Sequence, residues 1–398
     1  MDKLKWKSFK IVLNTTIKNS ALAYFYILNL VLFLILYCPS LNANFIAWDK
    51  ENDVWLTQTS EHFSISYLSI HQTDADRVLQ IAEEVHRELI PFFENSPEER
   101  TDIIMYDDSD YAIPNYSALE QGEIRLLMTP PTEVIDLAET ENWIYLYLSN
   151  EYSNILHFNL AKGTLRGLFL SPEFTPSFLI EGLSLYLTSY SQLQSKYLGS
   201  SKFAMKMRME VAADELMQLQ QVILSNKQWP LESMYLYGAY FIHYLAITYG
   251  EDKIFDFLEN YNQNLFSYLS LNTETEKVFG KEFLTLWDEF QDYLTIKFSS
   301  QISLLGDNQV NGDLLLNTPF LQVTANHQDG LLSSFVNGED RHQIINYQGK
   351  EWQQITATHK LVAMDTHPTS GIAITRNIAY LDGRKLNDIF IYDDNEWT

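Results

Sequence analysis

The segment Leu148–Leu160 reads "LSNEYSNILHFNL", and its spacing predicts a helix that carries a polar stripe. Asn150 and Asn154 are four residues apart, so both side chains lie on one face of a helix. Glu151 is adjacent, and His157 follows on roughly the same face. A second predicted helix at 176–190, "PSFLIEGLSLYLTSY", carries Glu181. If both glutamates face one space, their like charges raise at least one pKa, and the asparagine amides can donate hydrogen bonds to them.

The composition is that of a folded, acidic protein. The chain has 398 residues, a formal net charge of −25 and 14% aromatic residues. This length is enough for two domains and a large core. A strongly negative surface repels a phosphate backbone, so we expect no nucleic-acid partner.

The first 43 residues predict a targeting segment. Several lysines precede the apolar run 21–37, and the small residue Ala43 follows it. This arrangement is typical of an export signal, and the run is also nearly long enough to stay in a membrane as an anchor. We expect an exported, periplasmic or extracellular protein, or alternatively one anchored by residues 21–37. Cys38 is the only cysteine, so an internal disulfide is excluded.

The next 260 residues predict an α+β domain, residues 44–303. Phe63, Ile65 and Tyr67 alternate with polar residues and predict a strand. An amphipathic helix is expected at 73–95 and further strands at 101–106 and 123–128, with Pro114 in the loop between them. From about 136 to 300 the pattern is helical. A small sheet followed by many helices is an α+β arrangement.

The last segment, 304–398, predicts an all-β region with an internal repeat. The stretch "IINYQGKEW" (344–352) aligns with "IFIYDDNEW" (389–397) at an offset of 45 residues. That period, with short strands and turn pairs, is typical of β-propeller blades. About two blades fit here, which cannot close a ring. We therefore expect either that the sequence is the front of a longer protein or that these sheets pack against something else.

Several motifs together resemble one family of enzymes. The segments are "SEHFSISY" (60–67), "NEYSNILHFN" (150–159), "PSFLIEGLSLY" (176–186), "YLYGAYFIHYLAITYG" (235–250) and "VFGKEFLTLWDEFQDYL" (278–294). In this order they resemble the gluzincin-type domain of the peptidase MA superfamily of zinc metallopeptidases. The resemblance is to exported bacterial members in which this domain precedes a WD40-like propeller. It implies a zincin-like fold followed by blades.

The resemblance also implies a role for each polar residue. Asn150 and Asn154 occupy the positions of the two histidine ligands of the HExxH motif, Glu151 that of the general base and Glu181 that of the third ligand. Amide side chains are weak donors to Zn²⁺ compared with imidazole or carboxylate. We therefore expect no cofactor, with Glu151 a vestigial general base, unless the ancestral zinc site is still occupied.

Two residues could still contribute to catalysis. His157 is a candidate substitute ligand beside Glu151 and Glu181, although a structural histidine is the simpler interpretation. Tyr237 is a candidate catalytic residue near a substrate carbonyl, but packing beside Gly238 explains it as well.

The sequence thus favours a catalytically inactive metallopeptidase homologue that acts as a scaffold for an extended peptide or a protein. The alternatives are an active zinc peptidase with substitute ligands, and a truncated or decayed member of a peptidase–propeller family. An uncleaved leader would add the membrane as a partner.

Overall fold

The structure is a computed structural model of the chain. The chain consists of two compact units, Met1–Asn52 and Asp53–Thr398. All residues whose structure is described belong to the second unit. They are 54–93, 96–110, 122–129, 142–160, 175–190, 198–224, 233–263, 267–306, 312–313, 315, 321–327, 330–335, 341–348, 351–367, 371–381, 383–393 and 396–398.

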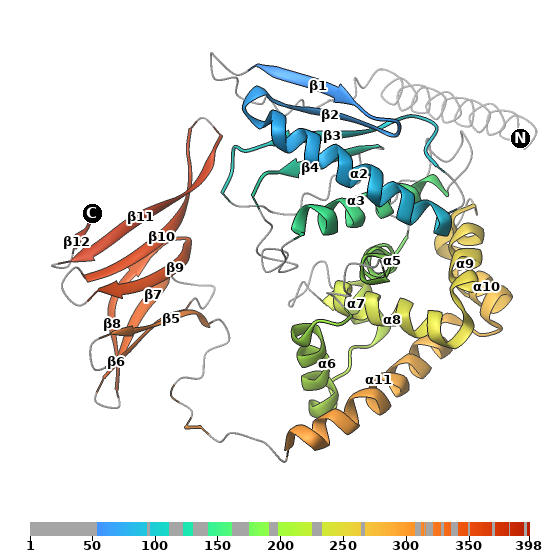
Figure 1. The fold of residues 1–398 in the computed structure, drawn as a ribbon. Coiled ribbons are helices and arrows are strands. Elements are labelled where there is room, and N and C mark those ends of the chain that lie inside the picture. The colour runs from blue at the N-terminus through green and yellow to red at the C-terminus, as the bar shows by residue number, and fades with distance from the viewer. Residues whose placement is uncertain are drawn as a thin grey trace, which may run out of the picture. The chain divides into compact units, whose positions relative to one another are not determined.

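A four-stranded sheet opens the described chain (Figure 1). Its strands follow the chain order: β1 (Trp55–Thr59), β2 (Phe63–Leu68), β3 (Thr101–Tyr106) and β4 (Glu123–Leu127). The first two strands pair antiparallel, and β2, β3 and β4 run parallel. In β2 the side chains of Phe63, Ile65 and Tyr67 are buried on one face, as their alternation predicted.

Helix α2 (Gln72–Phe93) follows the short 3-10 turn η1 (Ser69–His71) and connects the antiparallel pair to β3. Its apolar residues recur at three- and four-residue steps and are buried, among them Val78, Val85 and Leu89. Helix α2 packs along the sheet and also against α3 (Figure 1).

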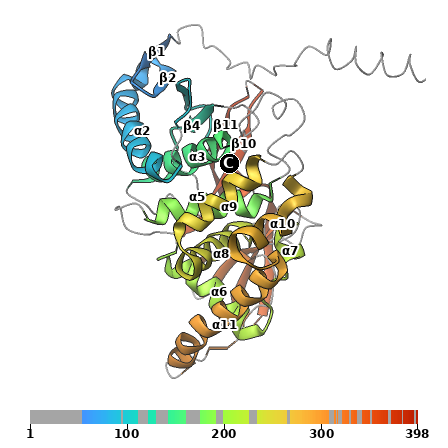
Figure 2. The same ribbon diagram turned by 90° about the vertical axis from the view of Figure 1, so that its right-hand side faces the viewer.

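The central part of the chain is helical (Figures 1 and 2). Its helices are α3 (Trp143–Asn159), α5 (Ser177–Tyr190), α6 (Ser201–Ala213), α7 (Leu219–Ile223), α8 (Ser233–Tyr249), α9 (Glu251–Gln263), α10 (Ser267–Phe279) and α11 (Phe283–Gly306). Helices α3 and α8 are apolar around most of their circumference and are buried on nearly all sides. They share one hydrophobic core with the sheet and α2.

Two glycines allow α5 and α8 to cross at very short range. A Cβ atom on Gly182 would lie 2.4 Å from the carbonyl carbon of Gly238, and one on Gly238 would lie 2.2 Å from the carbonyl oxygen of Phe178. Neither position has room for a side chain. This close crossing fixes α5, the helix that carries Glu181, against the centre of the core.

The C-terminal region contains two further four-stranded sheets. The first consists of β5 (Leu321–His327), β6 (Gly330–Phe335), β7 (His342–Gln348) and β8 (Glu351–Thr358). The second consists of β9 (Leu361–His367), β10 (Gly371–Ala379), β11 (Lys385–Asp393) and β12 (Glu396–Trp397). In each sheet, strands that are neighbours in sequence pair antiparallel. The two sheets share a second core, which includes Leu332, Ile344, Leu361 and Ile374.

The predicted α+β class is confirmed, and the strands predicted at 101–106 and 123–128 and the helix at 73–95 are present within one or two residues. None of the described helices is long and apolar enough to cross a membrane. The predicted leader at 1–43, with its apolar run 21–37, and the loop with Pro114 lie outside the described residues.

Candidate functional site

Helices α3 and α5 bring three of the predicted site residues together. Asn150 and Glu151 lie in the middle of α3, and Glu181 lies on α5, which packs against it. The side chain of Asn150 hydrogen-bonds to both carboxyl groups. Asn150 and Glu181 are buried, and Glu151 is partly buried. The two glutamates therefore share one amide group.

A serine on α5 orients that amide. Ser184 Oγ lies 2.7 Å from Asn150 Oδ1 and 2.8 Å from the carbonyl oxygen of Asn150. Ser153 Oγ in turn donates to Ser184 Oγ at 2.7 Å. Because Oδ1 accepts from Ser184, the NH₂ group of Asn150 is directed to the carboxyl groups. The hydroxyls thus fix Asn150 as a donor.

The site favours protonated carboxyl groups. Burial raises the pKa of Glu151 to about 7, and the hydrogen bond from Asn150 lowers it only in part. Burial and the charge of Glu151 raise the pKa of Glu181 to about 8, again against the hydrogen bond from Asn150. The pair consequently carries much less than two negative charges near neutral pH.

Asn154, at the second predicted ligand position, lies one turn further along α3 and is buried. Its Oδ1 atom has no hydrogen-bond partner within the described part of the chain. An unpartnered buried amide oxygen is unfavourable by about 1–3 kcal/mol.

His157 contacts another helix through one of its ring nitrogens. Its Nε2 atom lies 3.2 Å from Nδ2 of Asn262, on α9. The amide nitrogen donates, so Nε2 accepts. His157 is 1% exposed. Its surroundings agree with a structural histidine that connects α3 to α9.

Tyr237 occupies a different polar group. Its hydroxyl donates to the carboxyl group of Glu210 on α6 and accepts a hydrogen bond of 2.7 Å from the backbone N–H of Met217. Its ring stacks on Trp287 at a centroid distance of 6.0 Å. These contacts connect α6, α8 and α11, and they account for the tyrosine without a substrate.

The residues present do not fit a zinc ion. Among the described residues, no three histidine, cysteine, aspartate or glutamate side chains are grouped so as to hold a metal. The oxygen of Asn150 already accepts from Ser184, and Nε2 of His157 already accepts from Asn262. Asn154 and the two glutamates remain, and tight zinc sites are built from imidazole, thiolate and carboxylate.

An unpaired strand edge lies beside this cluster. Within the described residues β4 is the last strand of its sheet, so one side of it pairs with no other strand. The backbone N–H of Met128 donates to the carbonyl of Tyr106, so by alternation Arg125 directs its N–H and carbonyl away from β3. Tyr147, one turn before Glu151, donates to that carbonyl of Arg125 at 2.8 Å. The carboxyl group of Glu151 is close enough to raise the pKa of Tyr147 in addition to the larger effect of burial.

Three side chains that contact the predicted site residues were not predicted from the sequence: Ser153, Ser184 and Asn262. Ser153 is three residues after Asn150, and Ser184 is three residues after Glu181. That spacing places Ser153 on the same helix face as Asn150 and Ser184 on the same helix face as Glu181, so the sequence could have identified both serines. Asn262 is 105 residues from His157, and no local spacing predicts that contact.

Comparison with known proteins gives no family for this chain. No protein-family model matches it, and no curated protein matches it either.

Proposed function

We propose that this protein is a non-catalytic relative of gluzincin metallopeptidases that binds an extended peptide or protein segment. One observation carries the proposal: Asn150, which the resemblance assigns to a ligand position, hydrogen-bonds through its side chain to the carboxyl groups of both Glu151 and Glu181. Ser184 orients the amide, and burial favours protonated carboxyl groups. Asn150, Ser184 and the two glutamates thus satisfy one another's polar groups, and Glu151 lies beside an amide in place of the metal-bound water that a general base requires.

Peptide binding is supported by the edge of β4 that pairs with no other strand of the described residues. An extended peptide can add as a further strand to such an edge, with main-chain hydrogen bonds supplying affinity. A peptide on this edge would pair with outward backbone groups of β4 such as the N–H of Glu123 and pass close to Tyr147 and Glu151. The net charge of −25 favours peptides with basic residues.

The metal-free assignment is tested by measuring zinc content and peptide cleavage together. We expect the full-length chain, incubated with zinc and then dialysed, to retain far less than one zinc per molecule and to cleave no unstructured peptide. The double variant Asn150→His, Asn154→His supplies two imidazoles at i and i+4 beside Glu181 and should gain zinc. Stoichiometric zinc with chelator-sensitive cleavage in the unchanged protein would overturn the proposal.

The binding assignment is tested by changing a single backbone donor. Glu123 is the first residue of β4, and its N–H also points away from β3. Glu123→Pro removes that N–H, whereas Glu123→Ala removes only the side chain. With labelled basic decapeptides as the probe, we expect Glu123→Pro to weaken binding at least about tenfold relative to Glu123→Ala. Equal affinities in the two variants would contradict binding at this edge.

We further propose that the two C-terminal sheets are successive blades of a β-propeller-like arrangement. The repeat at an offset of 45 residues gives equivalent contacts. Tyr347 pairs with Trp352 across β7 and β8 at a ring distance of 5.0 Å, and Tyr392 pairs with Trp397 across β11 and β12 at 4.9 Å. Four antiparallel strands in sequence order are typical of a blade. Export or anchoring through residues 1–43 remains part of this proposal.

A further inference from the structure

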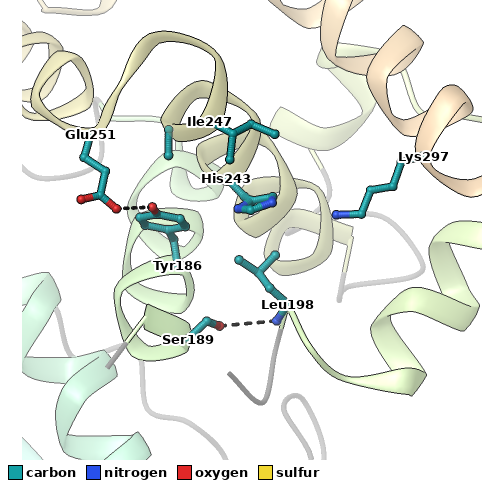
Figure 3. Close-up of a pocket in the computed structure, with 8 residues that line it drawn as sticks. Tyr186, Ser189, Leu198, His243, Ile247, Glu251 and Lys297 are labelled. Carbon is teal, nitrogen blue, oxygen red and sulfur yellow. Dashed lines mark hydrogen bonds between the residues drawn. The ribbon is translucent and has the colours of Figure 1, made fainter. Parts of the chain in front are cut away.

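A separate pocket lies at the far end of α5, away from the Asn150 cluster. It has a volume of about 490 Å³ and lies among α5, α8, the start of α9 and α11 (Figure 3). Its walls include Tyr186, Ser189, His243 and Lys297. Glu181 is five residues before Tyr186, so the two sites share a helix but no lining residue. A volume of this size suits a small organic molecule.

Lys297 gives the pocket a positive charge. Its Nζ atom lies 5.1 Å from the ring centre of Tyr240 and 5.4 Å from that of Tyr293, and it donates to the Tyr293 hydroxyl at 3.1 Å. No carboxyl group of the described residues lies within ion-pair distance of it. This is unusual in a chain with 52 acidic and 27 basic residues. The aromatic rings hold the ammonium group in place but do not neutralise it.

His243 lies between Lys297 and the opposite wall, and Figure 3 shows its ring facing the pocket. Neither ring nitrogen hydrogen-bonds to another described residue. Burial, with the charge of Lys297, lowers the pKa of His243, so the ring is neutral near pH 7 and offers one donor and one acceptor. Ser189 accepts a hydrogen bond from the N–H of Leu198 at 3.4 Å, which leaves its own proton to donate.

The opposite wall sets the orientation of a ligand. Glu251 accepts a hydrogen bond of 2.5 Å from the hydroxyl of Tyr186, and Figure 3 shows this pair across the pocket from Lys297. Its negative charge keeps an anion at the Lys297 side. Apolar contact is available from Leu198, Ala246 and Ile247, and Ile247 is 57% exposed.

We propose that this pocket binds a small monocarboxylate with a short apolar chain. The carboxylate pairs with Lys297 and accepts a hydrogen bond from His243, which lies next to Lys297 in Figure 3, and the chain covers Leu198 and Ile247. Charge-assisted hydrogen bonds of this kind supply most of the selectivity.

Three probes of equal length separate charge from hydrophobicity: hexanoate, hexylamine and hexanol. Calorimetry on the full-length chain should show saturable binding of hexanoate and none of hexylamine, with hexanol much weaker. Hexanoate should also shift the NMR signals of His243 and raise its pKa, because a negative charge then lies beside the ring.

Variants at Lys297 complete the test. Lys297→Gln should weaken hexanoate binding about ten- to a hundredfold, and Lys297→Arg, which keeps the charge, should restore most of it. Lys253→Gln, an exposed change on α9, is the control and should leave the affinity unchanged. Thermal unfolding establishes that each variant is folded. Absence of hexanoate binding, equal binding of hexylamine, or unchanged affinity in a folded Lys297→Gln variant would overturn the proposal.

Discussion

At the scale of single residues, the pair Glu151–Glu181 shows how a polar core can exist without a cation. Two ionised carboxylates in a buried space are strongly unfavourable. The structure offers two compensations, namely a shared amide from Asn150 and a pKa near or above neutrality for each glutamate. Both compensations make the cluster sensitive to pH.

We predict that this pair makes the protein less stable as pH rises. The pKa of Glu181 is about 8 in the folded state against 4.5 for the free side chain, so between these values the folded state binds more protons than the unfolded state. The stabilisation is fully present below about pH 4.5 and is lost as pH rises through about 8. Glu181→Gln, which resembles the protonated acid, should therefore be more stable than the unchanged protein at pH 9, by on the order of a few kcal/mol. Urea unfolding between pH 6 and 9 measures this difference.

Glu276→Gln, on the exposed side of α10, is the matched control and should leave the pH profile unchanged. A cation bound at Glu181 would reverse the result, because the substitution would then remove a ligand. Loss of stability in Glu181→Gln at every pH would contradict the raised pKa of Glu181.

At the scale of elements, the crossing of α5 and α8 determines where Glu181 lies. We predict that Gly182→Ala destabilises the protein by about 3 kcal/mol or more. The new Cβ atom would lie 2.4 Å from the backbone of Gly238, and a backbone atom cannot move aside as a flexible side chain can. Alanine's higher helix propensity offsets only about 1 kcal/mol of this. Chemical denaturation measures the loss.

Gly306→Ala is the control for helix propensity, since nothing lies within 4 Å of a Cβ at that position. It should be neutral or slightly stabilising. A Gly182→Ala variant as stable as Gly306→Ala would show that the two helices do not approach so closely.

Elements with strong local periodicity could be predicted from the sequence. The alternation of Phe63, Ile65 and Tyr67 and the helical spacing of Val78, Val85 and Leu89 each reflect one buried face, which a short window reveals. The contact of Gly182 with Gly238 could not be predicted, because it depends on how two helices cross. The candidate site shows the same contrast. Asn150, Glu151 and Glu181 could be selected from a local motif, whereas the contact of Asn262 with His157 could be found only from the three-dimensional structure.

The repeat in the two C-terminal sheets offers a matched pair of substitutions. Ile344 in β7 is 0% exposed, and its counterpart Ile389 in β11 is 71% exposed. We predict that Ile344→Ala costs about 2–4 kcal/mol of stability and Ile389→Ala less than about 0.5 kcal/mol. Equal losses in the two variants would show that Ile389 is covered in solution.

At the scale of the whole described chain, the buried apolar residues form two separate cores. One combines the β1–β4 sheet with the helices, and the other lies between the two C-terminal sheets. No residue belongs to both. Each core can therefore respond to a substitution without repacking the other, since distant sites without shared partners behave additively.

We predict that thermal unfolding shows two transitions that single substitutions move independently. Far-UV circular dichroism at the helical minimum should follow the first core, because the helices lie there, and Ile344→Ala should leave that transition in place. Gly182→Ala should lower the midpoint temperature of the first-core transition. It should leave the transition of the C-terminal sheets, followed by the fluorescence of Trp352 and Trp397, unchanged. The chain has six other tryptophans, among them Trp287, which is buried in the first core. The signal of Trp352 and Trp397 is therefore obtained as the difference between the unchanged protein and the double variant Trp352→Phe, Trp397→Phe. A single transition that either variant shifts in both signals would mean that the two cores unfold as one cooperative unit.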